Sequence, residues 1–326
     1  MIQRRIFLCA LGACALGASL PAPAQQPRVP RVGMLAFGPA PTDRDAAFVD
    51  SMRELGYIEG KNVAYEWRFA RFQVDRLNAL AKELVRSAVS VIVTIERGIA
   101  PAHEATATIP IVMLVSADPV RSGYAASLAR PGGNITGMTS LAEAIAPKQI
   151  ELLKLLLPKL TRVGVLLSPT NVNANNLVLE SLHTAARKLN VQVFTNYAAT
   201  AAAIEQAFSE MSRHRVEALI VPRATLFSDS YQGRQVAELA AKARLPAIYT
   251  GWEFAGGGLM SYAPSITESY RRAATYVDKI LRGAKPGDLP IEQPTSFELV
   301  INRKIAKDLG LAIPNELLLR ADRVIE

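Results

Sequence analysis

The amino-acid sequence predicts an α/β protein with two doubly wound, Rossmann-like lobes and a ligand cleft between them. Nearly continuous apolar runs such as "VSVIVTI" (89–95) and "IPIVMLV" (109–115) are typical of strands in a parallel sheet that is covered on both faces. These runs alternate with amphipathic stretches, which is the order of a βαβ chain. The order then starts again, because "RVGVLLSP" (162–169) mirrors "RVGMLAFGP" (31–39) and is followed by the same alternation.

The first lobe is expected to contain four strands joined by helices. Its first helical segment carries apolar residues at Phe48, Val49 and Met52, the spacing of a helix that buries one face. The next helical segment repeats this spacing at Leu77 and Leu80. We expect strands at 32–37, 63–70, 89–95 and 109–115, and helices at 43–55, 76–86 and 100–107.

The second lobe follows the same order of elements. "VEALIVP" (216–222) reads as a buried strand, and "LPAIYTG" (245–251) as the strand after it. We expect strands at 162–169, 191–196, 216–222 and 245–251, and helices at 148–157, 175–189, 203–213 and 235–243.

Glycines gather in "ARPGGNITG" (129–137), which could be a phosphate-binding loop, a glycosylation acceptor or a turn. A dinucleotide-binding loop needs G-x-G-x-x-G between a strand and a helix. Here the glycine spacing differs, and the stretch follows a helix and precedes a strand. We therefore interpret 131–133 as a helix stop and turn, and 134–139 as a strand leaving the first lobe. The acceptor triplet at Asn134 is interpreted as a chance match.

The N-terminal residues have the layout of an export signal. Arg4 and Arg5 precede an apolar run over 6–20, and the residues 22–24 (Ala-Pro-Ala) have the form of a cleavage site. The run is shorter than the roughly 20 residues that a membrane span needs. We expect a signal peptide at 1–24. The paired arginines leave both Sec and twin-arginine export open.

Composition excludes several classes of function. The only two cysteines, Cys9 and Cys14, lie in the expected signal, so the mature chain has neither a disulfide framework nor a thiol nucleophile. The net charge is +8 and the pI is near 9.6, but the basic residues are scattered. No aromatic residues interleave with a basic cluster, so the sequence argues against a nucleic-acid partner.

Catalytic and metal-binding motifs are also missing from the sequence. His103, His183 and His214 each lie in an expected helix, without a second ligand at metal-binding spacing. There is no P-loop and no G-x-S-x-G nucleophile elbow. The sequence therefore predicts a binding protein with no metal and no cofactor, and not an enzyme.

The expected ligand site lies beyond the carboxyl ends of the strands, where open parallel sheets bind ligands. Phe37 and Trp252 would hold a flat or apolar ligand between their rings. Arg97 and Arg223 would bind a carboxylate in bidentate fashion, or alternatively pair internally with Glu96, Glu253 or Asp118. The candidate ligand-binding residues are Phe37, Thr94, Glu96, Arg97, Gly98, Ser116 and Asp118 in the first lobe, and Ser168, Asn171, Arg223, Trp252, Glu253 and Tyr262 in the second.

Four segments, taken in order, carry a resemblance to a known family. They are 55–70 ("LGYIEGKNVAYEWRFA"), 109–139, 258–314 and 317–326 ("LLLRADRVIE"). These segments closely resemble the exported substrate-binding proteins of ABC transporters, in the group that includes tryptophan- and tyrosine-binding members. The resemblance covers nearly the whole mature chain.

The resemblance implies a type I periplasmic-binding fold, in which three crossovers join two lobes around a small ligand. The N-terminal lobe would comprise 29–140 and 265–295, and the C-terminal lobe 141–264 and 296–326. A monomer in the periplasm would capture a small organic solute, such as an amino acid or another carboxylate. Its partners would be an inner-membrane ABC permease and the ATPase of that permease. The alternative is a ligand sensor that presents the same fold to a membrane receptor.

The sequence departs from the family pattern on expected site loops. Family members usually have small residues where Glu96 and Arg97 stand, and an acidic or small residue at the position of Arg223. They commonly have glycine at the position of Ala263. Because these positions lie on cleft loops, the resemblance predicts a small organic ligand without specifying an aromatic amino acid.

Overall fold

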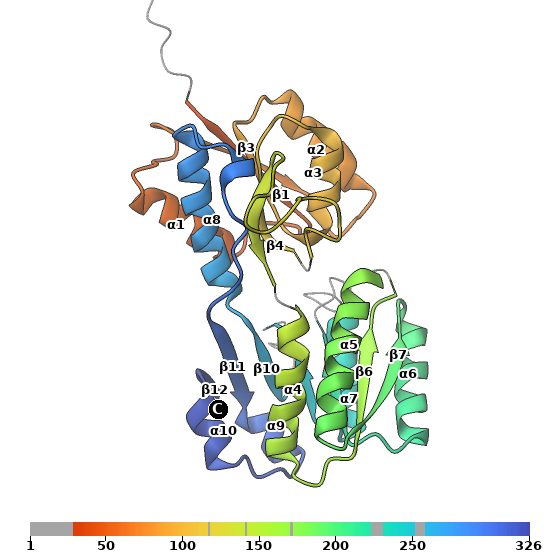
Figure 1. Ribbon diagram of the computed structural model, residues 1–326. Coiled ribbons are helices and arrows are strands. Elements are labelled where there is room, and N and C mark those ends of the chain that lie inside the picture. The colour runs from red at the N-terminus through yellow and green to blue at the C-terminus, as the bar shows by residue number, and fades with distance from the viewer. Residues whose placement is uncertain (1–28, 117, 141, 170–171, 223–230, 252–257) are drawn as a thin grey trace, which may run out of the picture.

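The N-terminal lobe is built on a parallel five-stranded sheet of order β2-β1-β3-β4-β5 (Figure 1). The computed structural model describes residues 29–116, 118–140, 142–169, 172–222, 231–251 and 258–326. The strands are β1 (Arg31–Ala36), β2 (Ala64–Phe69), β3 (Val91–Thr94), β4 (Ile111–Ser116) and β5 (Ile135–Thr139). The helices of this lobe are α1 (Asp43–Glu54), α2 (Arg76–Arg86), α3 (Ile99–Ala105) and α8 (Ile266–Leu281).

The C-terminal lobe is built on a seven-stranded sheet of order β12-β11-β10-β9-β8-β6-β7. The strands are β6 (Arg162–Leu167), β7 (Gln192–Tyr197), β8 (Ala218–Val221), β9 (Ala247–Tyr249), β10 (Met260–Pro264), β11 (Phe297–Asn302) and β12 (Arg323–Ile325). The helices are α4 (Ala142–Leu156), α5 (Val172–Lys188), α6 (Ala201–Arg213), α7 (Tyr231–Lys242), α9 (Arg303–Asp308) and α10 (Asn315–Arg320). β11 runs antiparallel to β10, whereas the other neighbours in this sheet are parallel.

The two sheets share one strand order, which confirms the internal repeat predicted from the sequence. The order β2-β1-β3-β4-β5 of the first lobe corresponds to β7-β6-β8-β9-β10 of the second, and β11 and β12 extend the second sheet at one edge. The doubly wound α/β architecture follows because β1, β2 and β3 are each followed by a helix of the first lobe, and β6, β7 and β8 by a helix of the second, and these helices pack back onto the sheets.

Some elements differ from the sequence-based prediction. α4 begins at Ala142, well before the predicted start at 148, and Pro147 lies inside the helix. Proline is normally found in the first turn of a helix, so the sequence does not predict that the helix extends before Pro147. The sequence also does not predict β10, because the strand is short and ends in Pro264, which argues against a central strand.

Helices cover both faces of each sheet, which explains why the inner strands β3, β4, β8 and β9 are buried along their whole length. In the N-terminal lobe, Phe48 of α1 and Tyr276 of α8 are buried against one face, and Leu84 of α2 and Ile99 of α3 against the other. In the C-terminal lobe, α4 and α5 cover one face and α6 and α7 the other. Each lobe therefore has its own hydrophobic core.

The stretch 129–137 is a turn that leads into β5, as predicted, but the expected helix before it is wrong, because the described residues 118–130 form turns and bends and the turn is therefore no helix stop. Gly132 has a positive φ of 79°, and its N–H donates to the carbonyl oxygen of Gly287 at 3.1 Å. The side-chain amide of Asn134 donates to two carbonyl oxygens in the loop before β4, at 3.0 and 2.8 Å. These contacts hold the turn against neighbouring loops, so its glycines and Asn134 serve the structure.

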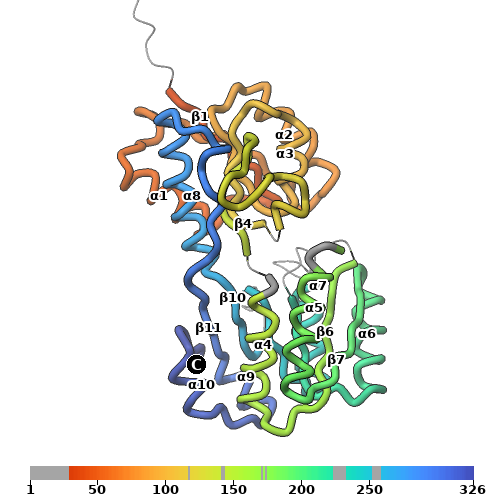
Figure 2. Tube along the Cα trace, in the orientation of Figure 1, coloured from red at the N-terminus to blue at the C-terminus, as the bar shows by residue number. Residues whose placement is uncertain are grey.

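The chain crosses between the lobes three times (Figures 1 and 2). The links run from β5 to α4, from β10 to α8, and from η3 (Pro286–Asp288) to β11. β5 and β10 therefore both end where the chain enters the opposite lobe. Because β4 runs parallel to β5, and β9 parallel to β10, the carboxyl edge of each sheet faces the other lobe.

Glu292 holds the last crossover against the N-terminal lobe. Its backbone N–H donates to the carbonyl of Gly137 at 2.9 Å, and its carbonyl accepts the N–H of Thr139 at 2.9 Å. Its carboxylate accepts two hydrogen bonds of 2.6 Å from Arg272 of α8. The hydrogen bonds from Arg272 hold the pKa of Glu292 below its usual value of 4.5, and the charge of Lys279 acts in the same direction.

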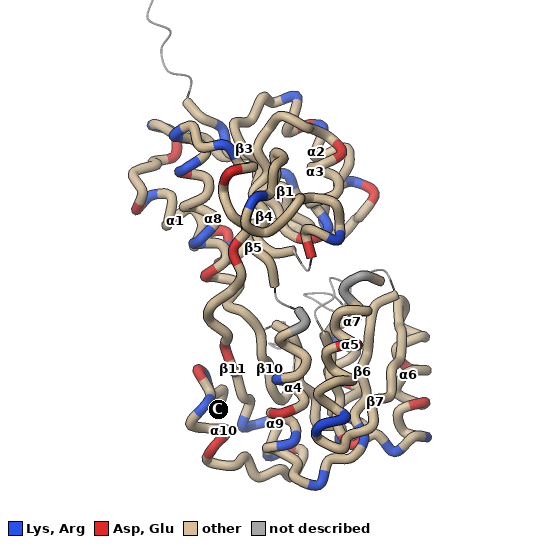
Figure 3. The backbone as a smooth tube through the Cα atoms, viewed as in Figure 1, with Lys and Arg blue, Asp and Glu red and all other residues tan. Residues whose placement is uncertain are grey.

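The surfaces of both lobes carry charges of both signs. Lys and Arg are interspersed with Asp and Glu over the helices and loops (Figure 3). Within the described ranges, no helix combines the length and the apolar character that crossing a membrane requires. Among the same residues, no group of three or more His, Cys, Asp or Glu is arranged to hold a metal ion.

Gly137→Ala should destabilise the protein strongly. Gly137 has a φ of +131°, and a Cβ at this position would overlap the carbonyl oxygen of Met113 in β4. Backbone strain and overpacking together should cost about 3 kcal/mol. The matched control is Gly123→Ala, where φ is +77° and a Cβ meets nothing within 4 Å, so about 1 kcal/mol is expected. Equal losses of unfolding free energy in urea would contradict this assignment.

Glu292→Gln should lower stability at neutral pH and have a smaller effect in acid. A carboxylate with a depressed pKa stabilises the fold above its unfolded pKa, and this contribution is lost as the pH falls through the folded pKa. The Arg272 and Glu292 side chains are 43% and 36% exposed, so solvent screening limits the contribution at neutral pH to about 1 kcal/mol.

Urea unfolding as a function of pH measures this effect. The difference between the wild type and Glu292→Gln should shrink as the pH falls below 4.5. The control is Asp50→Asn, which removes a more exposed ion pair with Arg53 and should change stability little at any pH. A wild-type–variant difference that is constant with pH would show that the carboxylate charge has no role.

Candidate ligand-binding site

Buried polar side chains gather where the carboxyl edges of the two sheets face each other. Burying polar groups is costly unless they have partners, so such a concentration marks a region with a special role. The buried polar residues at these edges are Thr94, Ser116, Thr139 and Ser140 in the N-terminal lobe, and Ser168, Asn175 and Thr250 in the C-terminal lobe.

Three side chains stand in a row along the N-terminal carboxyl edge, and we call them the edge row. The loops after β2, β1 and β3, which are neighbours in that order, carry Phe72, Phe37 and Arg97. The rings of Phe72 and Phe37 meet edge to face, with centroids 5.6 Å apart. The guanidinium carbon of Arg97 lies 5.3 Å from the centroid of the Phe37 ring. These steps are close to the spacing of paired strands, about 4.8 Å.

Arg97 is half-buried, and its guanidinium contacts an aromatic ring of the described residues. Its guanidinium lies over the Phe37 ring in a cation–π geometry. Among the described residues, none forms a salt bridge with Arg97. Burial lowers the pKa of Arg97, and the charge of Glu96 acts in the opposite direction. A partly desolvated guanidinium, with its fork of donors, is suited to a carboxylate that arrives from outside.

Backbone strain is concentrated on the same edge. Four of the seven described non-glycine residues with positive φ lie two residues beyond a helix, where left-handed backbone commonly ends helices. They are Ala88, Asn190, Arg215 and Arg244. The other three are Arg71 (φ 54°), Phe72 (φ 63°) and Glu96 (φ 38°), in the loops after β2 and β3. Such strain costs about 1–3 kcal/mol per residue and clusters at functional sites.

Thr94 and Gly98, both predicted site residues, shape the loop that carries Arg97. Thr94 is 1% exposed, and its hydroxyl donates to the carbonyl of Leu35 at 2.9 Å. Gly98 ends the short helix η1 (Glu96–Gly98), and a Cβ there would overlap the Thr94 hydroxyl oxygen. Both residues therefore help to set the position of the Arg97 loop.

Ser116 is the last residue of β4, and Asp118 lies two residues beyond it. Both form hydrogen bonds within the N-terminal lobe. The Asp118 carboxylate accepts the backbone N–H groups of Val120 and Arg121 at 3.1 and 2.9 Å, and lies 3.6 Å from the Arg121 side chain. Asp118 thus organises its own loop and pairs with Arg121, so the internal pairing of Asp118 with Arg97 that the sequence left open is not formed. Ser116 is buried, and its carbonyl accepts the N–H of Ser140 at 2.9 Å.

The C-terminal edge contains a buried amide–hydroxyl pair that the sequence does not predict. Gln149 of α4 donates a hydrogen bond from Nε2 to Oγ1 of Thr250 at 2.8 Å. Thr250 directly follows β9. The Oε1 atom of Gln149 makes no hydrogen bond within the described part of the chain. Nearby, the Ser168 carbonyl accepts from Asn175 Nδ2 at 2.7 Å. These bonds hold the loops after β6 and β9.

Tyr262 lies on β10, away from the edge row. Its ring stacks on Phe297 of β11, with centroids 5.6 Å apart and planes 12° apart. Burial raises the pKa of Tyr262, and the charges of Asp322 and Glu151 act in the same direction. The ring thus packs against the core of its own lobe. Four other predicted site residues lie outside the described part of the chain: Asn171, Arg223, Trp252 and Glu253.

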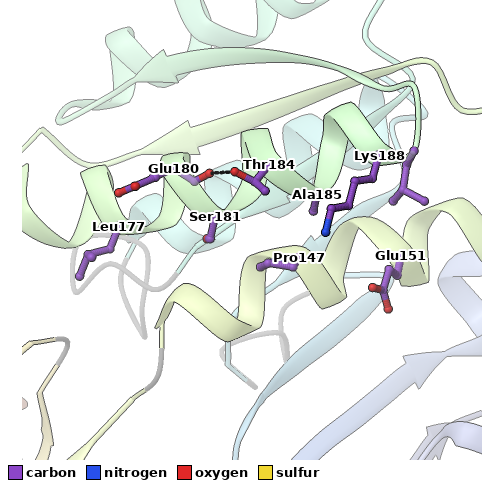
Figure 4. A pocket seen from close by; sticks show the side chains of 9 residues that line it. Pro147, Glu151, Leu177, Glu180, Ser181, Thr184, Ala185 and Lys188 are labelled. Carbon is purple, nitrogen blue, oxygen red and sulfur yellow. Dashed lines mark hydrogen bonds between the residues drawn. The ribbon is translucent and has the colours of Figure 1, made fainter.

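A separate open groove runs between α4 and α5 on the surface of the C-terminal lobe (Figure 4). Its volume is about 550 Å³, and its lining includes Pro147, Leu177 and Lys188. The Thr184 hydroxyl in its wall donates to the Glu180 carbonyl at 2.9 Å. Because one lobe alone forms this groove, it is distinct from the facing carboxyl edges.

Residues 32–325 match the family described as ABC transporter substrate binding protein. The matched range spans both lobes and includes the edge row. The chain belongs to this family. A tyrosine-binding protein from Clostridioides difficile (strain R20291) is 27% identical over 282 residues, 86% of this chain and 80% of that protein.

Two solved structures are similar over both lobes. An ABC domain in complex with L-Trp from Streptococcus pneumoniae is 25% identical to this chain, with a TM-score of 0.81. The superposition covers 91% of this chain and 99% of the Streptococcus pneumoniae chain. A conserved domain protein from Vibrio cholerae O1 biovar El Tor has a TM-score of 0.81 and 26% identity, over 91% and 100% of the two chains. These matches confirm the resemblance and the type I periplasmic-binding fold. The protein is a substrate-binding protein of the ABC transporter type, a family without enzymatic activity.

Gly98→Ala should destabilise this substrate-binding protein by forcing the Arg97 loop to shift. The new Cβ would overlap the Thr94 hydroxyl, and about 2 kcal/mol should be lost. Thr94→Ala alone should cost about 1 kcal/mol through its hydrogen bond to Leu35.

The double variant provides the decisive comparison for this loop. Because the overlap is absent when both side chains are alanine, the combined loss should be smaller than the two single losses together by about 1 kcal/mol. Urea unfolding of the three variants measures the coupling. Additive losses would show that Thr94 does not limit the space at Gly98.

Proposed function

We propose that this substrate-binding protein captures a small organic carboxylate between its lobes and delivers it to an ABC importer. The observation that carries the proposal is Arg97, a half-buried guanidinium that rests on Phe37 and forms no salt bridge with the described residues. Lobe closure would desolvate this cation further, and an unpaired buried charge is costly. A ligand carboxylate would supply the missing partner through two parallel hydrogen bonds.

The edge row favours a ligand that carries an apolar group beside its carboxylate. Phe37 offers an aromatic surface next to the guanidinium of Arg97. Asp118, which could have neutralised Arg97, pairs instead with Arg121. Amino acids with an apolar or aromatic side chain combine the two required groups. The tyrosine-binding relative and the L-Trp complex support this class of ligand.

The second lobe would close over the ligand from the opposite carboxyl edge. Asn171, Arg223, Trp252 and Glu253 stay predicted contributors from that edge, with Trp252 facing the apolar part of the ligand. Arg223 stays a second candidate for binding the carboxylate.

The transport role rests on the export signal and on the family. The signal expected at 1–24 supports a periplasmic location for a monomeric receptor. The family supports an inner-membrane permease and its ATPase as partners. Charges of both signs over the two lobes support a small-molecule ligand and give no support to a nucleic-acid partner.

A thermal-shift screen of the mature chain tests the ligand class. The panel comprises amino acids, aromatic acids, nucleosides and sugars. A ligand present at about 100 times its dissociation constant should add about 2.7 kcal/mol to the unfolding free energy. Stabilisation by apolar or aromatic amino acids is the expected result. Stabilisation by nucleosides or sugars alone would reject the carboxylate proposal.

Arg97→Ala should weaken binding of the ligand found in that screen by about 2–5 kcal/mol, because the ligand carboxylate loses its partner in a desolvated site. Isothermal titration calorimetry measures the change. Arg130→Ala is the control, since Arg130 is exposed and precedes β5 at the opposite edge of the sheet. Equal affinities of the wild type and Arg97→Ala would remove Arg97 from the site.

A further inference from the structure

Phe72 is an exposed aromatic residue at the outer end of the edge row. The residue is 46% exposed, and its ring contacts Phe37 edge to face at a centroid distance of 5.6 Å. It follows β2, which is the edge strand of the N-terminal sheet. It belongs to none of the candidate residues derived from the sequence, because no glycine or binding motif marks its loop.

The backbone at Phe72 is strained and firmly held. Arg71 and Phe72 both have left-handed backbone, with φ of 54° and 63°. The N–H of Phe72 donates to the carbonyl of Phe37 at 2.8 Å, and the N–H of Arg71 to that of Gly38 at 3.1 Å. A third bond joins the N–H of Ala70 to the carbonyl of Ala36 at 2.9 Å. Two adjacent strained residues persist only when the surroundings hold them, and such positions cluster at ligand clamps.

Folding stability alone does not explain why Phe72 is both exposed and strained. A half-exposed phenylalanine gains little from burial, and glycine would adopt the same backbone without strain. The loop nevertheless places an aromatic ring at the carboxyl edge, beside the Phe37 ring over which the Arg97 guanidinium lies. The arrangement costs stability and creates an aromatic surface that faces the other lobe.

We infer that Phe72 is a specificity-determining residue that forms the apolar end of the ligand site. The inference rests on the proposed function, since it assumes a carboxylate at Arg97. From Arg97, the row extends 5.3 Å to the Phe37 ring and a further 5.6 Å to the Phe72 ring. A small amino acid held at Arg97 ends near Phe37, whereas one with a large apolar side chain extends toward Phe72. The ligand class is therefore a carboxylate with a large apolar or aromatic group.

Four amino acids that differ only in their apolar group serve as probes: L-alanine, L-leucine, L-phenylalanine and L-tryptophan. Dissociation constants are measured by calorimetry for the wild type, Phe72→Gly, Phe72→Leu and Arg97→Ala. Val74→Ala is the matched control, because Val74 is a 49% exposed apolar residue of the same loop. Melting temperatures are recorded for every variant without ligand.

Phe72→Gly should weaken L-tryptophan and L-phenylalanine about three- to tenfold more than L-leucine, in line with the loss of one aromatic contact. Its melting temperature should not fall, since glycine relieves the left-handed strain. Phe72→Leu should recover part of the loss, and Val74→Ala should change none of the four constants.

Two results would overturn the inference. One is a Phe72→Gly variant in which all four affinities change by the same factor, with a lower melting temperature, because Phe72 then only supports Phe37. The other is a wild type that binds none of the four probes, which rejects the ligand class as well. If Arg97→Ala leaves the affinities intact while Phe72→Gly still alters their ratio, the carboxylate contact at Arg97 fails but the apolar end at Phe72 is supported.

Discussion

Parallel pairing of the strands determines where the other features of this protein lie. A parallel strand can be reached only by a crossover from the far end of its neighbour, so all strand-to-helix loops emerge at one edge of the sheet. Phe37, Phe72 and Arg97 are distant in the sequence, yet the order β2-β1-β3 brings them together. The same constraint places Ser168 and Thr250 at the facing edge of the second lobe. The site is a consequence of strand order and requires no local motif.

The N-terminal lobe is complete only with residues from the last quarter of the chain. α8 packs on α1, and its Tyr276 fills the core beneath β4. Glu292 then pairs with β5 through its backbone and with Arg272 through its carboxylate. Neither lobe is therefore a continuous segment, and folding of the first lobe depends on residues that follow most of the second. This dependence couples the lobes in stability even though each has a separate core.

The sequence predicts the fold well because apolar runs and helical spacing directly reflect burial in a doubly wound sheet. It predicts Phe37 and Arg97 as site residues because both follow a buried strand. It also names Thr94 and Gly98 as candidates beside Arg97, but their structural role depends on a hydroxyl–carbonyl bond and on space that no periodicity reveals. Phe72 is not predicted because its left-handed backbone is imposed by hydrogen bonds to the β1 loop. Tyr262 is placed by the alternation of β10, which gives it the same face as the buried Met260.

The unequal lengths of the three crossovers limit how the lobes move. A single residue, Ser265, separates β10 from α8, and two residues separate β5 from α4, whereas 293–296 separate the hydrogen-bonded Glu292 from β11. Links of one or two residues change direction but cannot lengthen, so any movement between the lobes would be a rotation about an axis through the short links, with the longer link bending to accommodate it. In the proposed function, a solute would then reach the edge row from the side of the molecule opposite the crossovers, and the swing of one lobe would control its access and its release together.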